Sequence, residues 1–377
     1  MNRILMARSN PIEPDSRLEK EANALKKKGY EVILLAWDRA STHPYETDTK
    51  RLLNSQVKRI SIGAKAEYGA GMKSLIPHLR FQLLLFWWMV RNRSLYDTCH
   101  LCDIDTAFFG SIAARLCHKQ AVFDLFDYKS TNADSLAKKI RKKLEDHTIN
   151  KADAIIICTE QRREQISHTH PKSITVIHNS PPMVQVDSSI CKSTSNRIKV
   201  AYVGILEERR RLKDIAEVIQ DMPDVELHIG GFGQLDEYFT DLSSQKDNIF
   251  YYGRIPYEDT LALENDCDVI TAIYDLSIGN SYYAAPNKFY ESLLLGKPTI
   301  MVKGSGMSQY VEQYDFGELI ECTKDGIREG LTRLIQRKDE WPEMAVRMKK
   351  LYLDEFNWDI MEERLAELYD SLSAKRG

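Results

Sequence analysis

The chain has 377 residues, 43% hydrophobic and 28% charged, a composition typical of a globular protein with room for two domains. No run of about 18 apolar residues is present, and the apolar run at the N-terminus is too short for a signal peptide, so neither a spanning helix nor export is expected. Seven cysteines, an odd number, favour reduced thiols and a cytoplasmic location.

The net charge of −3 hides an asymmetry along the chain. Residues 1–180 contain 29 Lys and Arg against 20 Asp and Glu, whereas the remainder contains 23 against 35. A basic front half favours an anionic substrate or surface. No nucleic acid is expected among the partners.

Short apolar runs alternate with helical patterns from the N-terminus onward. Uninterrupted apolar strands separated by helices predict a parallel sheet covered on both faces. The strands predicted in the front half are residues 3–7, 31–37, 97–101, 121–125, 154–158 and 174–177, and the helices are residues 18–29, 105–117 and 136–150.

A polar, Pro- and Ser-rich stretch, residues 178–197, predicts a linker before the alternation restarts. The second set of strands is predicted at residues 198–204, 225–231, 248–253, 268–274, 298–302 and 318–321, and the helices between them include residues 214–220, 258–265, 287–295 and 326–336. The predicted fold is α/β, with two Rossmann-like, doubly wound domains facing a cleft, and ligands bound beyond the C-terminal strand ends.

The stretch APNKFYESLLLGKPTI predicts a helix that opens at Pro286 and Asn287 and closes at Gly296. A helix N-terminus presents free N–H groups and a positive dipole end, which attract phosphate. Lys288 adds a full charge there, and Glu291 offers two acceptors for a ribose diol. An amphipathic helix whose charges face water is the alternative.

A glycine at the end of the first strand of this second set, Gly204, lets the backbone approach a ligand closely. The basic residues that follow suit a diphosphate, because arginine binds phosphate through a planar fork. Either Arg210 or Arg211 is the candidate phosphate cation, and a solvated basic turn is the alternative.

These residues carry a family resemblance. YVGILEERRRL, NIFYYGRIPYEDTLALENDCDVITAIYD and APNKFYESLLLGKPTI resemble the nucleotide-binding domain of GT-B-fold glycosyltransferases of the retaining family four. PDSRLEKEANALKKKGYEVILLAWDR and LYDTCHLCDIDTAFFGSIAARL resemble segments of the acceptor domain of that family. The resemblance implies an acceptor domain at residues 1–182, a linker at 183–197, a nucleotide-sugar domain at 198–355, and a C-terminal helix, 356–377, that packs back on the first domain.

The resemblance also implies a chemistry. It predicts metal-independent, retaining transfer of a sugar from a UDP- or GDP-sugar, with no cofactor, in bacterial surface-polysaccharide or lipid-linked oligosaccharide synthesis. Arg210 or Arg211 and Lys288 would stabilise the leaving diphosphate, while Gly204, Asn287 and Glu291 would help to bind the donor. The acceptor hydroxyl would lie near four residues of the first domain: Asp15, Arg17, His100 and Asp127.

Departures from the family pattern leave alternatives open. The first of two glutamates common in the family is Tyr283 here, and a usual histidine is Cys102. A catalytically inactive scaffold that binds the donor or a partner enzyme therefore remains an alternative. A sugar-nucleotide epimerase of similar two-domain shape is another, but the sequence shows no set of acid/base carboxylates or histidines for it.

Three motifs point elsewhere. Cys99 and Cys102 have the CxxC spacing of zinc or redox sites but lack a second ligand pair, so no metal site is predicted. Asp103 and Asp105 resemble a metal-binding DxD motif, but we expect them to cap a helix beginning at Thr106. The stretch GGFG lacks the third glycine of a dinucleotide loop.

Residues 78–93, HLRFQLLLFWWMVRNR, predict a helix with apolar residues on all sides and arginines at its ends. A buried core helix is the preferred interpretation. Binding at the inner face of the cell membrane is the alternative, because tryptophans and flanking arginines suit a headgroup layer. Five cations between Lys138 and Lys143 would add affinity for anionic lipid.

Overall fold

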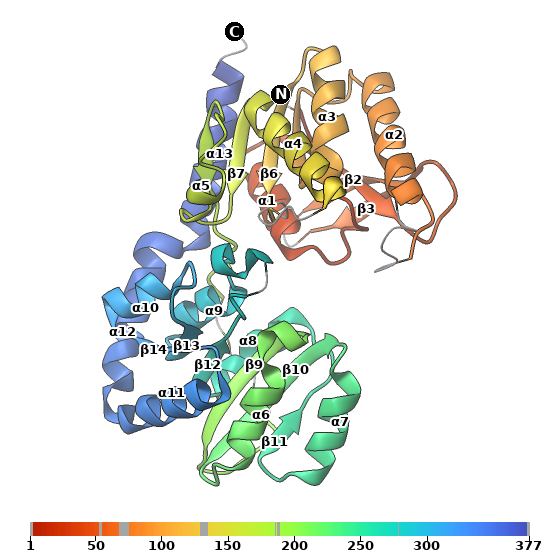
Figure 1. Cartoon of the computed structure of the whole chain (residues 1–377). Helices are drawn as coiled ribbons and strands as arrows, with labels where there is room; N and C mark the ends of the chain where they lie inside the picture. The colour runs from red at the N-terminus through yellow and green to blue at the C-terminus, as the bar shows by residue number, and fades with distance from the viewer. Residues whose placement is uncertain are drawn as a thin grey trace. The chain divides into compact units, whose positions relative to one another are not determined.

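The computed structural model describes residues 3–52, 55–67, 75–128, 135–184, 186, 189–277 and 279–374. The chain forms two compact units, each with its own sheet (Figure 1). Unit 1 comprises Met1–His178 together with Asp359–Gly377, and unit 2 comprises Asn179–Trp358.

Unit 1 is built on a sheet with the strand order β3-β4-β2-β1-β5-β6-β7-β8. All neighbouring strands are parallel except β3 and β4. Central strands with both faces covered need apolar side chains on both faces, and β2 is buried at six consecutive positions. The strands are β1 (Arg3–Ala7), β2 (Glu31–Asp38), β3 (Glu46–Arg51), β4 (Gln56–Gly63), β5 (Thr98–Cys102), β6 (Gln120–Leu125), β7 (Ala154–Ile157) and β8 (Ile174–Val176).

The helices of unit 1 cover this sheet. They are α1 (Ser16–Lys27), α2 (Leu75–Arg91), α3 (Ile104–Leu116), α4 (Leu136–Lys151), the short α5 (Arg162–Gln165) and the C-terminal α13 (Trp358–Ala374). Helix α3 contacts both α2 and α4, so the three lie side by side. Helix α13 packs against α1, where Lys27 Nζ lies 2.8 Å from Glu362 Oε2 and the hydroxyl of Tyr30 donates to Asp370.

Unit 2 contains a parallel sheet with the order β11-β10-β9-β12-β13-β14. The strands are β9 (Ile198–Leu206), β10 (Val225–Gly233), β11 (Ile249–Tyr251), β12 (Val269–Ala272), β13 (Thr299–Val302) and β14 (Gly317–Ile320). The α-helices are α6 (Leu212–Gln220), α7 (Asp236–Gln245), α8 (Tyr257–Asp266), α9 (Asn287–Leu295), α10 (Ser308–Tyr314), α11 (Lys324–Gln336) and α12 (Trp341–Leu351). Short turns η2 (Glu208–Arg210), η3 (Gly279–Tyr283), η4 (Lys338–Glu340) and η5 (Tyr352–Phe356) connect them.

The prediction of two doubly wound α/β sheets is confirmed, and the helix predicted between Pro286 and Gly296 is α9. Gly296 has φ of 67°, the left-handed conformation that ends many helices at glycine. The antiparallel pair β3–β4 was not predicted. Strand β3 is almost wholly exposed and its sequence, ETDTKR, has no apolar residue, so it carries no hydrophobic signal.

One close approach in unit 2 requires glycine. Gly231 of β10 lies opposite Gly204 of β9, and its φ is 131°. A Cβ atom on Gly231 would lie 1.8 Å from the carbonyl oxygen of Gly204. Two backbones can therefore meet at the carboxyl end of β9 only because position 231 has no side chain.

Candidate functional site

Three consecutive arginines follow β9, and the structure gives them different partners. Arg209 forms an ion pair with Glu207, and Arg211 Nε lies 2.5 Å from Asp214 Oδ2. Among the described residues Arg210 has no carboxylate partner, and its Nε and Nη1 atoms are buried without a hydrogen bond. A buried donor without an acceptor is costly in free energy. Of the two candidates left open by the sequence, Arg210 is therefore the one available to an anionic ligand.

An aromatic ring holds Arg210 in place. The guanidinium carbon lies 3.5 Å from the ring centroid of Tyr274, which follows β12. Burial raises the pKa of Tyr274, the charges of Arg210 and Lys288 oppose this rise, and Glu291 adds to it. Three of the predicted donor-site residues, Arg210, Lys288 and Glu291, thus lie near Tyr274.

Lys288 lies between two carboxylates at the start of α9. Its Nζ is 2.5 Å from Glu291 Oε2 and 2.8 Å from Glu264 Oε1. Lys288 is 7% exposed, Glu291 1% and Glu264 0%. The sequence predicted Lys288 as a phosphate cation, but in the structure its charge is already matched. Its direct effect is to hold the carboxylate of Glu291 in a fixed position.

Glu264, on α8, is a site residue that the sequence did not predict. Burial raises its pKa to about 8, although the Lys288 ammonium opposes the rise. Burial lowers the pKa of Lys288, but Glu264 and Glu291 outweigh it and raise that pKa. Glu264 therefore keeps its proton to a higher pH than an exposed carboxyl does. In the sequence, Glu264 looked like one more polar residue of an amphipathic helix.

Gly204 and Asn287 also lie at the carboxyl edge of the unit 2 sheet. Gly204 is partly exposed on β9 and faces Gly231 across the strand pair. Asn287 begins α9, and its Oδ1 accepts a hydrogen bond of 2.8 Å from Asn179 Nδ2. The side chain of Asn287 is therefore occupied, and a Cβ atom on Gly204 would lie 3.2 Å from the Tyr202 hydroxyl.

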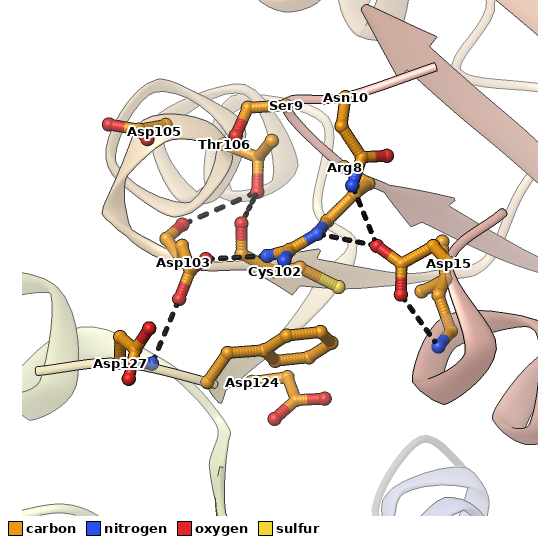
Figure 2. A network of polar contacts seen from close by, with 12 residues as sticks. Arg8, Ser9, Asn10, Asp15, Cys102, Asp103, Asp105, Thr106, Asp124 and Asp127 are labelled. Carbon is orange, nitrogen blue, oxygen red and sulfur yellow. Dashed lines mark hydrogen bonds and ion pairs between the residues drawn. The ribbon is translucent and has the colours of Figure 1, made fainter. Parts of the chain in front are cut away.

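A second polar network lies at the carboxyl edge of the unit 1 sheet (Figure 2). Arg8, directly after β1, donates from Nε to Asp15 Oδ2 at 2.9 Å and from Nη1 to Asp103 Oδ2 at 2.5 Å. Its guanidinium carbon lies 4.1 Å from the ring centroid of Phe126. Burial would lower the pKa of Arg8, but Asp103 and Asp15 outweigh it and raise the pKa. The sequence predicted Asp15 as an acceptor residue, and the structure places it in this ion-pair network.

Asp15 has a second role, because it caps α1. Its Oδ1 accepts from the backbone N–H of Leu18 at 3.2 Å, while its own N–H donates to Glu19 Oε1 at 3.0 Å. This reciprocal pair resembles a capping box and fixes where the helix begins. An acceptor substrate would therefore meet Asp15 as a side chain with several existing partners.

Asp103 does not cap its helix in the way that the sequence suggested. Helix α3 begins at Ile104 rather than Thr106, and the Asp103 side chain makes no capping hydrogen bond. Its backbone has φ of 58°, which is uncommon for aspartate, and its Oδ1 accepts from the backbone N–H of Asp127 at 3.2 Å. Asp103 thus joins the loops after β5 and β6, a role that Figure 2 displays.

Asp127 is the most exposed of the predicted acceptor residues. Its side chain is 56% exposed, and Oδ1 lies 3.9 Å from Arg162 Nη2. Carboxylate oxygens at this edge, where parallel strands end, are accessible to a ligand. The structure therefore brings Asp15 and Asp127 to one edge through Arg8 and Asp103.

Arg17 and His100 lie inside the core of unit 1 instead. Arg17 is 5% exposed, and it contacts Asp124 Oδ1 at 3.0 Å and Glu21 Oε1 at 3.1 Å. His100 has no exposed surface; its Nε2 is 3.1 Å from Asp124 Oδ2, and its Nδ1 is 2.8 Å from the Tyr369 hydroxyl. The structure thus buries both side chains, and their predicted roles as acceptor contacts stay predictions.

Burial and neighbouring charges act in opposite directions on the titratable groups of this cluster. Burial lowers the pKa of His100, but Tyr369, Cys102 and Asp124 outweigh it and raise the pKa well above the usual value. Burial works to raise the pKa of Asp124, yet Arg17 and His100 hold it below its usual value. Burial and Asp124 raise the pKa of Glu21, and Arg17 and His100 oppose the rise. The contacts among these residues join α1, β5, β6 and α13.

Within the described chain, His100, Cys102 and Asp124 present ligand-type atoms within 4.8 Å of one another. Two of the three are already engaged, because Arg17 pairs with Asp124 and the Tyr369 hydroxyl contacts His100. Burial raises the pKa of the Cys102 thiol to about 12, which disfavours the thiolate that a metal would need. These residues fit a metal poorly.

The chain matches two family descriptions that together span most of it. Residues 17–180 match Glycosyltransferase Family 4, and residues 187–351 match Glycosyl transferases group 1. The O-antigen biosynthesis glycosyltransferase WbnH of Escherichia coli is 26% identical over 184 residues, which are 49% of this chain and 50% of that protein. The chain thus aligns with about half the length of the curated relatives that it matches.

Solved structures share the whole fold. Sucrose-phosphate synthase from Thermosynechococcus elongatus superimposes with a TM-score of 0.80 at 15% identity, over 100% of both chains. Anabaena HepE, in complex with UDP and glucose, superimposes with a TM-score of 0.72 at 14% identity, over 98% of this chain and 100% of that one. With both sheets, both family matches and these neighbours in agreement, the chain belongs to the GT-B-fold glycosyltransferases of family-four type.

Proposed function

We propose that this chain transfers a sugar from a UDP- or GDP-sugar to a glycan or lipid-linked acceptor in bacterial surface-polysaccharide synthesis. The transfer retains the anomeric configuration and needs no metal. The name of the E. coli relative, an O-antigen glycosyltransferase, supports the pathway, and the UDP complex of the Anabaena neighbour supports the class of donor.

The observation that carries the proposal is the state of Arg210. Its guanidinium is stacked on Tyr274 with two buried nitrogen atoms that lack partners among the described residues. The diphosphate of a donor would supply the missing acceptors in a planar, charge-assisted contact. Glu291, held by Lys288, would accept from the ribose hydroxyls.

The chemical step follows from the placement of charge. As the bond between the sugar and the diphosphate breaks, negative charge grows on the leaving diphosphate. Arg210 and the N-terminus of α9 are fixed before the reaction begins, so they stabilise that charge without reorganisation. The positive charge thus comes from the protein, which is why we propose a reaction without a metal.

The acceptor side of the proposal rests on unit 1. Asp127 offers an exposed carboxylate at the carboxyl edge of the sheet, where it can orient an acceptor hydroxyl. Arg17 and His100 act from the core, by fixing the strands and loops that present this edge. Asp15, which is paired with Arg8, also helps to fix the loops that present this edge.

Titration of UDP- and GDP-sugars, with and without EDTA, tests the proposal. One nucleotide series should bind with micromolar to millimolar affinity, EDTA should leave that affinity unchanged, and Glu291→Ala should weaken it severely. An EDTA-dependent affinity would contradict the metal-free donor site, and Glu291→Ala with unchanged affinity would remove the ribose assignment.

Donor hydrolysis separates transfer from the two alternatives. A transferase without acceptor should slowly release free sugar and nucleoside diphosphate, whereas an inactive scaffold should leave the donor intact. An epimerase should instead convert the sugar while it remains linked to the nucleotide. Chromatography of the sugar and nucleotide fractions distinguishes the three outcomes.

A further inference from the structure

Helix α2 packs one apolar side into the core and exposes a second apolar side. Its core side contains Phe81, Leu85, Trp88 and Met89. The opposite side exposes large apolar side chains at helical spacing: Leu75 (61%), Ile76 (80%), Leu79 (51%), Leu83 (41%) and Trp87 (53%). The prediction of a wholly buried helix is therefore wrong for one side. An exposed apolar stripe of this length is typical of an interaction surface.

The two neighbouring helices extend the stripe. Helix α3 exposes Ile112 (40%) and Leu116 (64%), and α4 exposes Leu136 (75%) and Ile140 (50%). More than half of the large, exposed hydrophobic side chains in the described part of the protein lie on α2, α3 and α4. We call the outward surface of these three adjacent helices the α2–α4 face.

This face is also strongly basic. The three helices contain nine Lys and Arg residues against three Asp and Glu residues. Several of the cations have no ion-pair partner among the described residues, namely Arg91, Arg115, Lys139, Lys143 and Lys151. Cations that are not used within the protein are available to an anionic partner.

A pocket of about 490 Å³ opens between the C-terminal ends of α3 and α4. Arg115, His118, His147 and Lys151 line it, together with the apolar side chains of Phe108 and Ile112. Its one acidic lining residue, Asp153, already pairs with Lys172 at 2.7 Å. The pocket thus offers cations beside an apolar wall, which suits a phosphate group attached to a hydrocarbon.

We propose that the α2–α4 face docks on an anionic phospholipid bilayer, with the pocket between α3 and α4 receiving a headgroup phosphate. Apolar side chains with tryptophan would enter the boundary between headgroups and acyl chains, while the surrounding Lys and Arg contact anionic headgroups. No described helix is both long and apolar enough to cross a bilayer, so the attachment is to its surface. Docking of this kind would keep the protein beside a lipid-linked acceptor.

Vesicle flotation tests the proposal without donor or acceptor, so its outcome is independent of sugar transfer. Wild-type protein should bind vesicles with about one third phosphatidylglycerol at least tenfold better than pure phosphatidylcholine vesicles. Added salt should weaken this binding, because it screens exposed charges. Equal affinity for both kinds of vesicle, or none for either, would overturn the proposal.

Two double variants locate the surface. Leu83→Ser with Trp87→Ser removes apolar contacts, and Lys139→Glu with Lys143→Glu reverses two charges. The charge reversal should lower vesicle binding about tenfold or more, since one juxtamembrane cation contributes roughly a factor of five. The serine variant should lower it about tenfold or more because it removes two apolar side chains from the boundary layer. The matched controls lie on unit 2: Val346→Ser with Leu353→Ser, and Lys246→Glu with Lys338→Glu. Test variants that bind like the controls would contradict the assignment of the surface.

Two other occupants have their own readouts. If the face binds a second copy of the chain, sedimentation velocity should show a dimer that the Leu83 and Trp87 variant dissociates. If the pocket instead binds a soluble phosphate, glycerol 3-phosphate should bind saturably in a manner that Arg115→Glu abolishes, while anionic vesicles fail to bind. Either result would overturn bilayer docking, and thermal unfolding verifies that each variant is folded.

Discussion

Arg8 and Arg210 occupy corresponding places in the two units. Each lies between the first strand of its sheet and the helix that follows, and each stacks on an aromatic ring from the end of another strand, Phe126 or Tyr274. Arg8 has two carboxylate partners, whereas Arg210 has none among the described residues. The same local architecture thus yields a structural cation in unit 1 and an available cation in unit 2.

The difference lies in the neighbouring side chains. In unit 1, Asp15 and Asp103 follow the strand ends and point to Arg8 (Figure 2). In unit 2, Glu207 and Asp214 are taken by Arg209 and Arg211, so the middle arginine has no carboxylate left among them. Removing a cation that is paired within the protein leaves buried carboxylates without a partner, whereas an unpaired buried cation can gain its acceptor from a ligand.

The largest predicted effect is on stability and comes from Arg8→Met. The substitution keeps an apolar chain on Phe126 but leaves Asp15 and Asp103, which are mostly buried, without their cation. We expect a loss of about 3 kcal/mol in the free energy of unfolding, measured by chemical denaturation.

Arg59→Met is the control for that loss. Arg59 also pairs with two carboxylates, but Glu13 and Asp48 are 65% and 48% exposed, so water can replace the cation. Its cost should stay below about 1 kcal/mol. Equal costs for the two variants would mean that the Arg8 network is not structural.

A smaller effect is predicted for the aromatic platform of unit 2. Tyr274→Leu retains an apolar contact but removes the ring under Arg210, so the guanidinium loses a cation–π interaction of about 0.5–1 kcal/mol. Donor affinity should fall by roughly two- to fivefold in calorimetric titration. Unchanged affinity would show that the ring does not position the cation.

A dependence of stability on pH is also predicted, and it concerns Glu264. Burial raises the pKa of this carboxyl from 4.5 to about 8, so the folded protein keeps a proton that the unfolded chain releases. The contribution of Glu264 to stability therefore falls as pH rises from about 4.5 to about 8 and is constant above that. Glu264→Gln should remove this slope. The free energy of unfolding of the variant, relative to that of the wild type, should therefore rise across this pH range. Parallel pH profiles would contradict the raised pKa.

Most of the fold could be predicted from the sequence, because the strands and helices depend on hydrophobic periodicity. The apolar strands of both sheets and the boundaries of α9 follow from runs of Val, Ile and Leu and from Pro286 and Gly296. Strand β3 was not predicted, because an exposed edge strand needs no apolar side chain. The exposed apolar side of α2 was not predicted, because both sides of the helix are apolar and only packing decides which one is buried.

The candidate site was only partly predictable, because pairing between distant residues is invisible in one sequence. Arg8 pairs with Asp103, 95 residues away, and neither was predicted as a site residue. Glu264 meets Lys288 only because α8 and α9 pack together. His100 was predicted from its place in a motif, yet its strand places it in the core.

The central claim is that Arg210 is the cation available to the donor diphosphate. Calorimetric titration of the preferred nucleotide sugar into Arg210→Met, with Arg209→Met as the matched control, measures it most directly. We predict a 10- to 100-fold loss of affinity for Arg210→Met, as expected for a charge-assisted contact of about 1.5–3 kcal/mol, and a change below threefold for the control. Equal affinities in the two variants would contradict the account.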